Sequence, residues 1–125
     1  MPNKAKILVV DDEEAALQLL QDALEAGGYD VAVAHDGLEA WELLQKGTVK
    51  DIDLLLTDLV MPRMDGMALA RNVTKAYANV RILFTSGYAD EIVYDHQDLA
   101  GVSSFIPKPF DVTKLQRKVR EIVGR

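Results

Sequence analysis

The sequence has no cysteine among its 125 residues, which excludes disulfide bonds, zinc–thiolate sites and thiol catalysis. It has no apolar run long enough to span a bilayer, and its first residues lack the apolar core of a signal peptide. Basic residues are also in the minority, with 14 Lys and Arg against 20 Asp and Glu and a net charge of −6. This acidic balance argues against non-specific binding of nucleic acid. We expect a cytoplasmic protein that binds neither nucleic acid nor membranes directly.

Short apolar runs alternate with segments of helical periodicity along the chain. A chain of this length buries roughly two-thirds of its unfolded surface, so a single domain over residues 1–125 needs no cross-links. The apolar runs predict five strands, at Lys6–Val10, Asp30–Ala34, Leu54–Leu56, Val80–Phe84 and Ser103–Ile106. Helical patterns begin after Glu14, after Asp36, at Met67, at Asp90 and near Asp111, and the pattern from Asp90 to Leu99 is weak.

This alternation predicts an α/β fold. Short connections between strands and helices imply right-handed β–α–β units, a parallel sheet and helices on both of its faces. Five strands favour the flavodoxin-like order 2-1-3-4-5. In that order the first and third strands are neighbours, and their carboxyl ends meet at one edge of the sheet.

Acidic residues follow both of these neighbouring strands. Asp11 and Asp12 come directly after the first strand, and Asp58 comes two residues after the third apolar run. The predicted strand order would bring the three carboxylates into one small site. Two such charges about 4 Å apart repel by roughly 4 kcal/mol at an effective dielectric constant of 20. Either a raised pKa or a divalent cation relieves this repulsion, and Mg²⁺ suits oxygen ligands and phosphate chemistry.

Two further strand ends supply groups that suit phosphoryl chemistry. Lys108 follows the fifth strand and can neutralise a phosphoryl group, and Ser86 follows the fourth strand and can donate a hydroxyl hydrogen bond. A carboxylate nucleophile that forms an aspartyl phosphate is a known covalent strategy. Plainer interpretations stay open at this point: Asp58 also suits a solvated loop acid, and Thr85 competes with Ser86 as the hydroxyl donor.

Several polar residues have simpler explanations than chemistry. Acids suit helix N-termini, so Asp11 and Asp12 can also serve the helix that follows them, and Asp36 is predicted to cap the second helix, with Glu39 three residues later. Asp65–Gly66 suits a turn and a helix cap. His35 and His96 lack the spacing of metal ligands and are predicted to lie on the surface.

Five motifs in a fixed order give the sequence a family resemblance. They are VVDDE at 9–13, DGLEA at 36–40, DLLLTDLVMPRMDG at 53–66, TSGYA at 85–89 and KPF at 108–110. Each motif alone is weak, but the ordered set is specific. With this set the chain resembles, from end to end, the CheY-like receiver domains of response regulators in bacterial two-component signalling.

The resemblance implies a role for each residue of the predicted site. Asp58 would be the phosphoacceptor, and Lys108 would contact the phosphoryl group. Asp11 and Asp12 would bind Mg²⁺ (or Mn²⁺) together with Asp58, with Asp12 the more direct ligand of the acidic pair. The main-chain carbonyl of Val60 would complete the protein's share of the ligands.

The resemblance also implies a conformational switch. Ser86 would be the switch hydroxyl, and Phe105, three residues before Lys108, would be the switch aromatic. Phenylalanine offers no hydroxyl, so an output that needs one is not expected. The peptide bond between Lys108 and Pro109 is expected to be cis.

The implied function is a signalling switch rather than a turnover enzyme. A histidine kinase or a phosphotransfer protein would donate the phosphoryl group. Phosphorylation would then change which partner binds the face formed by the fourth helix, the fifth strand and the last helix. That partner would be an effector domain, another protein or a second copy of the chain in a weak homodimer. The chain would be either a stand-alone regulator or a part of a longer protein.

Three other functions compete with this interpretation. An aspartate-nucleophile phosphatase would carry a second acid two residues after Asp58, where this chain has Val60. A flavin or nucleotide carrier would have a Gly- or Ser-rich loop after the first strand, where this chain has acids. A degenerate receiver would serve only as an interaction or dimerisation module, and the complete set of site residues weighs against it.

Overall fold

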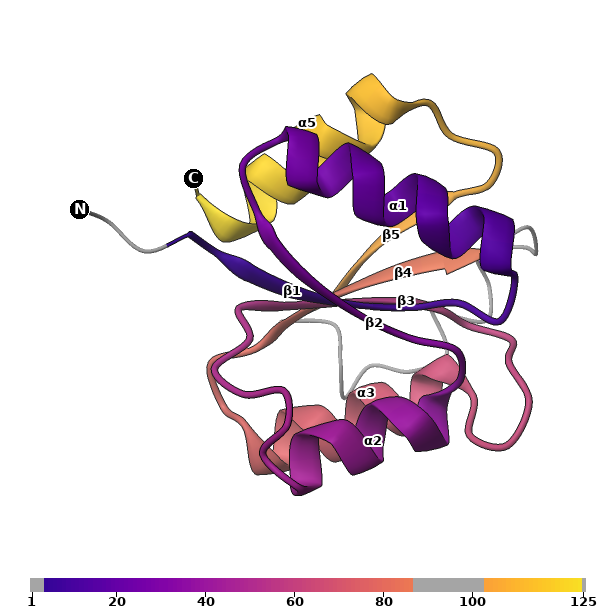
Figure 1. Cartoon of the computed structure of the whole chain (residues 1–125), viewed down its shortest axis with the longest axis vertical. Coiled ribbons are helices and arrows are strands. Elements are labelled where there is room, and N and C mark those ends of the chain that lie inside the picture. The colour runs from indigo at the N-terminus through magenta and orange to yellow at the C-terminus, as the bar shows by residue number, and fades with distance from the viewer. Residues whose placement is uncertain (1–3, 87–102, 125) are drawn as a thin grey trace.

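A five-stranded parallel sheet forms the centre of the protein (Figure 1). The structure is a computed structural model and describes residues 4–86 and 103–124. The strands are β1 (Lys6–Val10), β2 (Asp30–Ala34), β3 (Leu54–Asp58), β4 (Arg81–Ser86) and β5 (Ser103–Pro107). Their order is β2-β1-β3-β4-β5, and all four neighbouring pairs are parallel. The predicted fold class and strand order are thus confirmed.

Helices cover both faces of the sheet. Among the described residues they are α1 (Glu14–Ala26), α2 (Gly37–Gln45), α3 (Gly66–Ala76) and α5 (Val112–Val123). Figure 1 shows α1 and α5 on one face and α2 and α3 on the other. None of the helices in the described ranges is long and apolar enough to cross a membrane. The helix expected over Asp90–Leu99 lies outside the described residues.

The strand ends differ from the sequence prediction where polar residues continue the ladder. β3 runs through Thr57 to Asp58 instead of stopping at Leu56, and β4 begins one residue later than expected and includes Thr85. Asp58 and Thr85 are register partners in these two strands. Backbone pairing therefore extends past the end of the apolar pattern, and it carries Asp58 on the strand itself rather than on the loop.

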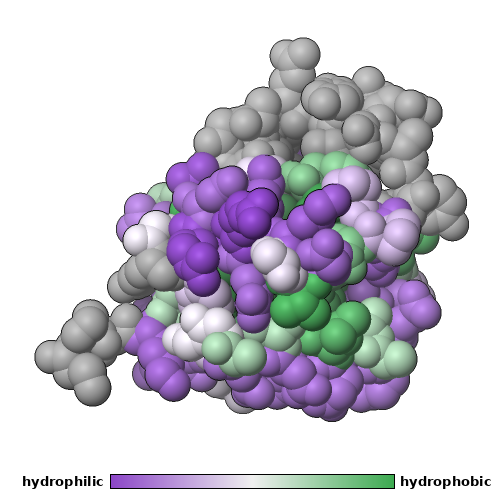
Figure 2. All heavy atoms as spheres, turned by 90° about the horizontal axis from the view of Figure 1, so that it is seen from above, coloured by the Kyte–Doolittle hydropathy of each residue, from purple (hydrophilic) through white to green (hydrophobic). Residues whose placement is uncertain are grey.

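Each face of the sheet has its own hydrophobic core. Side chains on β3 alternate between the two, with Leu54 and Leu56 packed beneath α1 and α5 and Leu55 packed on the side of α2 and α3. All five residues of β3 are buried. Figure 2 looks onto the α1 and α5 side, where hydrophilic residues make up most of the coloured surface around a smaller hydrophobic patch.

Aspartates fix the start of three helices. The carboxylates of Asp36, Asp65 and Asp111 accept hydrogen bonds from backbone N–H groups three residues later, at 2.8, 2.8 and 2.7 Å. The predicted cap at Asp36 is therefore confirmed. Glu39 does not complete a capping box, because its carboxylate accepts a hydrogen bond from the backbone N–H of His35, one residue before the cap.

Candidate functional site

Strand register explains why two of the predicted acids meet. β1 and β3 pair Val9 with Leu56, and both of these side chains lie in the core beneath α1 and α5. Because side chains alternate along a strand, Asp11 and Asp58, each two residues further on, continue on the same side of the sheet. The two carboxylates therefore arrive side by side at the carboxyl edge.

The three predicted acids form one cluster at this edge. Asp11, Asp12 and Asp58 each offer a carboxylate oxygen, and these oxygens all lie within 4.8 Å of one another. Asp11 is fully buried and Asp58 is 8% exposed, whereas Asp12 is exposed. The cluster thus has a buried floor of two acids and one acid open to solvent.

Lys108 joins the two buried acids. Its Nζ donates hydrogen bonds to Asp11 Oδ2 at 3.1 Å and to Asp58 Oδ2 at 3.0 Å. Partial burial lowers the pKa of Lys108, but the hydrogen bonds and charges of Asp58 and Asp11 outweigh it, and the net pKa is raised. The ammonium therefore stays charged between the two carboxylates. The Lys108–Pro109 peptide bond is cis, as expected.

Backbone donors hold the remaining carboxylate oxygens of the floor. Asp11 Oδ1 accepts a hydrogen bond from the backbone N–H of Glu13 at 2.9 Å, so Asp11 also shapes the turn into α1. Asp58 Oδ1 accepts one from the backbone N–H of Val60 at 3.2 Å. Both carboxylates are therefore oriented by the loop that follows their own strand.

Gly66 brings the start of α3 onto the backbone of Asp58. A Cβ atom at Gly66 would lie 2.0 Å from the main-chain oxygen of Asp58, a distance that no side chain tolerates. The Gly66 N–H also donates to the carbonyl of Leu59 at 2.9 Å. The sequence suggested turn and cap chemistry at Asp65–Gly66, and the structure adds this close approach between two backbones.

The charges and donor atoms of the cluster suit a hard divalent cation. Three carboxylates and one ammonium give it a formal charge of −2. All three acids offer oxygen atoms, the ligands that Mg²⁺ prefers. The cluster therefore carries more negative charge than Lys108 neutralises, and a hard divalent cation would balance this excess.

The remaining predicted site residues are placed less completely. Ser86 ends β4, where it is the register partner of Pro107, and the structure describes only its backbone. Phe105 lies in β5, is partly buried and packs against the core on the side of α2 and α3. Val60 follows Asp58 by two residues and leaves 52% of its surface exposed. Thr85, the competing hydroxyl, is buried within β4.

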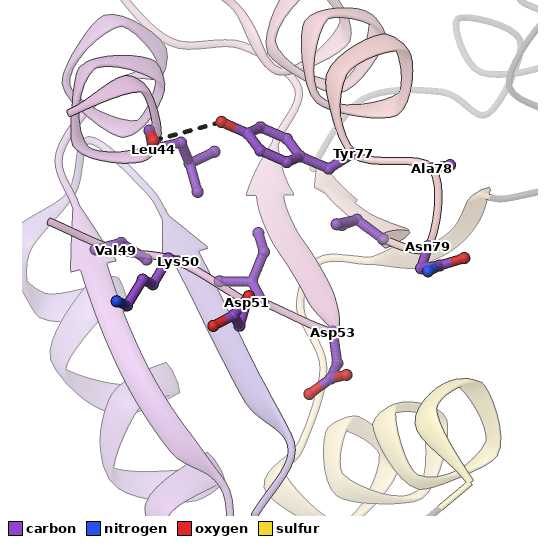
Figure 3. Close-up of a pocket in the computed structure, with 10 residues that line it drawn as sticks. Leu44, Val49, Lys50, Asp51, Asp53, Tyr77, Ala78 and Asn79 are labelled. Atoms are coloured by element: carbon purple, nitrogen blue, oxygen red, sulfur yellow. Dashed lines mark hydrogen bonds between the residues drawn. The ribbon is translucent and has the colours of Figure 1, made fainter. Parts of the chain in front are cut away.

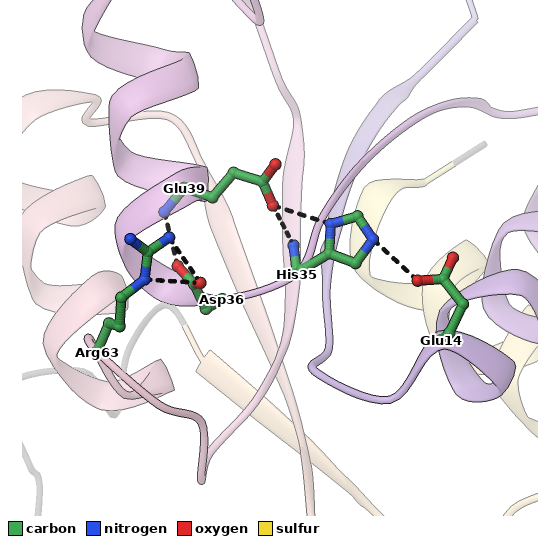
Figure 4. Close-up of polar contacts among 5 residues, drawn as sticks. All are labelled: Glu14, His35, Asp36, Glu39 and Arg63. Atoms are coloured by element: carbon green, nitrogen blue, oxygen red, sulfur yellow. Dashed lines mark hydrogen bonds and ion pairs between the residues drawn. The ribbon is translucent and has the colours of Figure 1, made fainter.

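Polar contacts around the starts of α1 and α2 were not expected from the sequence (Figure 4). His35 is a surface residue, as predicted, but its two ring nitrogens each lie 3.0 Å from a carboxylate, that of Glu39 and that of Glu14. Arg63 pairs with Asp36, with its Nη2 2.8 Å from Oδ2. The contacts of His35 with Glu14 and of Arg63 with Asp36 join residues that are 21 and 27 positions apart in sequence, so no local pattern revealed them.

A hollow of about 410 Å³ lies at the opposite end of the sheet (Figure 3). It is lined by residues that precede β3 and β4, among them Asp51 and Asn79, and by the end of α2. The hydroxyl of Tyr77 closes one side by donating to the carbonyl of Leu44 at 3.3 Å. No residue of the acidic cluster lines this hollow.

Comparisons with known proteins show the family to which the chain belongs. Residues 7–120 match the response regulator receiver domain family. The chain is 36% identical over 124 residues to a chemotaxis protein CheY homologue of Campylobacter jejuni, covering 95% of this chain and 92% of that protein. It is 32% identical over 125 residues to the sensor kinase CckA of Brucella abortus, covering all of this chain but only 13% of the kinase.

A solved structure carries the same fold. The response regulator protein TrrA of Thermotoga maritima, in complex with Mg²⁺–BeF, superposes with a TM-score of 0.80 at 29% identity, covering 94% of this chain and 98% of that one. The family match spans most of the chain, and the CheY homologue is similar over almost its full length. Receiver domains are generally signalling modules rather than enzymes. This chain belongs to the response regulator receiver domains of two-component signalling systems.

Proposed function

We propose that this chain is a phosphorylation-controlled switch, formed by one receiver domain over residues 1–125, in which Asp58 accepts the phosphoryl group. The observation that carries the proposal is the cluster itself: three carboxylates within 4.8 Å, two of them buried and joined by one ammonium. Such a site combines a nucleophile, an excess of oxygen ligands and a cation for phosphate oxygens. The Mg²⁺–BeF complex of TrrA supports it, because that protein shares the fold.

The phosphoryl donor in this proposal is a phosphohistidine on a histidine kinase or a phosphotransfer protein. A carboxylate oxygen of Asp58 attacks phosphorus, the phosphorus–nitrogen bond breaks, and its electron pair stays on the imidazole. The similarity to a sensor kinase supports a donor of this kind. Dephosphorylation needs only water, whose attack on the phosphorus of the aspartyl phosphate returns the Asp58 carboxylate and releases inorganic phosphate.

The charges at the site divide the work among the residues. Asp11, Asp12, Asp58 and the main-chain carbonyl of Val60 would hold Mg²⁺ (or Mn²⁺). When bound, the ion neutralises charge on the carboxylates and on the incoming phosphoryl oxygens. Lys108 already contacts Asp58 Oδ2 at 3.0 Å, so it is placed to contact the phosphoryl oxygens once Asp58 becomes an acyl phosphate.

Signal output in this proposal travels through β5 and α5. Phosphorylation of Asp58 adds charge and acceptor oxygens beside Lys108. Lys108 in turn comes three residues after Phe105 in the chain. The switch hydroxyl would be Ser86 at the end of the neighbouring strand β4. Together these residues would bias the surface that includes Phe105 and α5 between two arrangements, each with its own protein partner.

Intact mass spectrometry after incubation with acetyl phosphate tests the proposal. We expect one added phosphoryl group on the wild type with Mg²⁺, none in EDTA, and none on Asp58→Asn under either condition. Asp65→Asn is the matched control, because it removes an exposed acid yet keeps the oxygen that caps α3, and it should be phosphorylated like the wild type.

Failure to see an adduct has two explanations that a second probe separates. Beryllofluoride with Mg²⁺ mimics the phosphoryl group without being hydrolysed, so binding of beryllofluoride alongside a missing adduct would indicate rapid loss of phosphate. A folded protein that takes neither the phosphoryl group nor beryllofluoride would refute the proposal and favour a degenerate receiver that acts only as an interaction module.

A further inference from the structure

The loop between β3 and α3 carries Val60 and is fastened to the start of α2 by one ion pair (Figure 4). Arg63 Nε and Nη2 both reach Asp36 Oδ2, at 2.9 and 2.8 Å. The other oxygen of the same carboxylate, Asp36 Oδ1, caps α2 by accepting from the backbone N–H of Glu39. One carboxylate thus anchors a helix with one oxygen and a distant loop with the other.

Two features of the backbone show that the loop lies in close contact with the start of α2. Arg63 has a φ of +69°, a left-handed conformation that a residue with a side chain adopts only when its surroundings hold it there. A Cβ atom at Gly37 would lie 2.0 Å from the carbonyl oxygen of Met64, so the loop backbone rests directly on the first turn of α2. The loop is therefore seated on α2 by backbone contact as well as by charge.

The ion pair is partly shielded, which strengthens it relative to an ordinary surface pair. The Asp36 side chain is 13% exposed, although Arg63 is 55% exposed. Burial raises the pKa of Asp36, but the Glu39 N–H and the Arg63 guanidinium lower it more, so the net pKa is below its usual value. Asp36 is therefore charged and able to hold Arg63 throughout the neutral range.

We propose that Arg63 and Asp36 are positioning residues for the divalent cation, because their ion pair holds the loop on which Val60 lies. The inference rests on the proposed function, in which the Val60 carbonyl is a ligand. Neither residue touches the ion in this proposal. They keep the backbone three residues away, at Val60, in the arrangement that binding requires.

The sign of the effect separates positioning from simple electrostatics. Arg63→Gln removes a positive charge near a cation site, so charge alone would make Mg²⁺ bind more tightly. Asp36→Asn removes a negative charge, so charge alone would make it bind more weakly, while asparagine keeps an oxygen for the α2 cap. Positioning predicts weaker binding in both variants, because both break the same ion pair.

Isothermal titration with Mg²⁺, at fixed pH and ionic strength, measures these affinities. We expect about five- to tenfold weaker binding in each single variant and no further loss in the double variant, because the second change has nothing left to break. Arg63→Lys, which keeps the charge without the planar fork, should recover part of the loss. Lys75→Gln removes an exposed cation in the last turn of α3 and should leave the affinity unchanged.

Far-UV circular dichroism of every variant establishes that the fold is intact. Hydrogen exchange at the Val60 amide should be faster in Arg63→Gln and Asp36→Asn than in the wild type. Binding in Arg63→Gln that is equal to or tighter than wild type would overturn the inference while leaving the proposed function in place. Effects that simply add in the double variant would overturn it too. A wild-type protein that binds no Mg²⁺ would overturn both the proposed function and this inference.

Discussion

Replacing Lys108 with methionine should destabilise the protein far more than the loss of an ordinary surface lysine. The change keeps the length of the side chain but removes two charge-assisted hydrogen bonds, of 3.1 and 3.0 Å, to Asp11 and Asp58. Removing one partner from a buried ion pair costs about 3–5 kcal/mol. The Lys108 side chain is 23% exposed, so solvent screens part of this. We expect the free energy of unfolding to fall by about 2–3 kcal/mol.

Mg²⁺ should reduce the difference in unfolding free energy between wild type and Lys108→Met. Loss of the ammonium takes the formal charge of the cluster from −2 to −3, so a cation is attracted more strongly. If Mg²⁺ binds Lys108→Met tenfold more tightly, saturating ion stabilises the variant by about 1.4 kcal/mol more than it stabilises the wild type. A deficit that is large in EDTA should thus be reduced by about half in excess Mg²⁺.

Urea unfolding followed by circular dichroism at pH 7, in EDTA and in Mg²⁺, measures both effects. Lys46→Met is the control, because Lys46 is an exposed residue at the end of α2, and it should cost less than about 0.5 kcal/mol. Adding Asp58→Asn to Lys108→Met should restore part of the stability, because it removes one of the repelling carboxylates. Equal stability of Lys108→Met and wild type in EDTA would refute the charge argument.

Two further predictions concern the surface residue His35 and the backbone contact at Gly66. The pKa of His35 is raised chiefly by its hydrogen bond to Glu39; burial lowers it, and the charges of Glu39 and Glu14 raise it further. Protonated His35 therefore stabilises the folded protein. This contribution is complete below about pH 6.5 and is lost as pH rises through the folded pKa. His35→Gln should therefore lower the unfolding free energy at pH 5.5, by less than about 1 kcal/mol because the pair is exposed, and match wild type at pH 8.5; a deficit that is equal at both pH values would contradict this. Gly66→Ala should cost about 3 kcal/mol or more in urea unfolding, since its Cβ would meet the backbone of Asp58, whereas Gly47→Ala, with open space but a φ of +75°, should cost about 1 kcal/mol; similar costs would argue against the close approach.

The features that the sequence predicted well are those that follow from strand periodicity. A continuous apolar run predicted β1, and an alternating pattern predicted β2, both with the bounds that the structure shows. Alternation with helices predicted the sheet order, and the order then predicted that Asp11 and Asp58 would meet. Each step depends on a regular repeat or on the rule that parallel strands end together, and both are visible in one sequence.

The features that the sequence did not reveal depend on where loops lie in space. Arg63 reaches Asp36 because the β3–α3 loop folds back over the start of α2, and His35 reaches Glu14 because two other strand ends are adjacent. No repeat connects such residues, so the sequence predicted only a helix cap at Asp36 and a surface position for His35. The close approach at Gly66 was not predicted for a related reason. A glycine at the start of a helix suits a turn, and only the position of β3 shows that a Cβ atom at Gly66 would clash with the backbone of Asp58.

The acidic cluster is a cost to the fold that the core and Lys108 offset. Folding brings carboxylates together that repel by roughly 4 kcal/mol for a pair 4 Å apart, at an effective dielectric constant of 20. Burial of one leucine returns about 1.5–3 kcal/mol, and β3 buries three of them between two core clusters. The strand that carries Asp58 into the cluster is thus fully buried, and its packing resists the charge at its end. Core packing offsets the free-energy cost of the cluster but does not neutralise its negative charge, and Lys108 neutralises only part of that charge. A bound cation should therefore stabilise the wild type as well as the Lys108 variant.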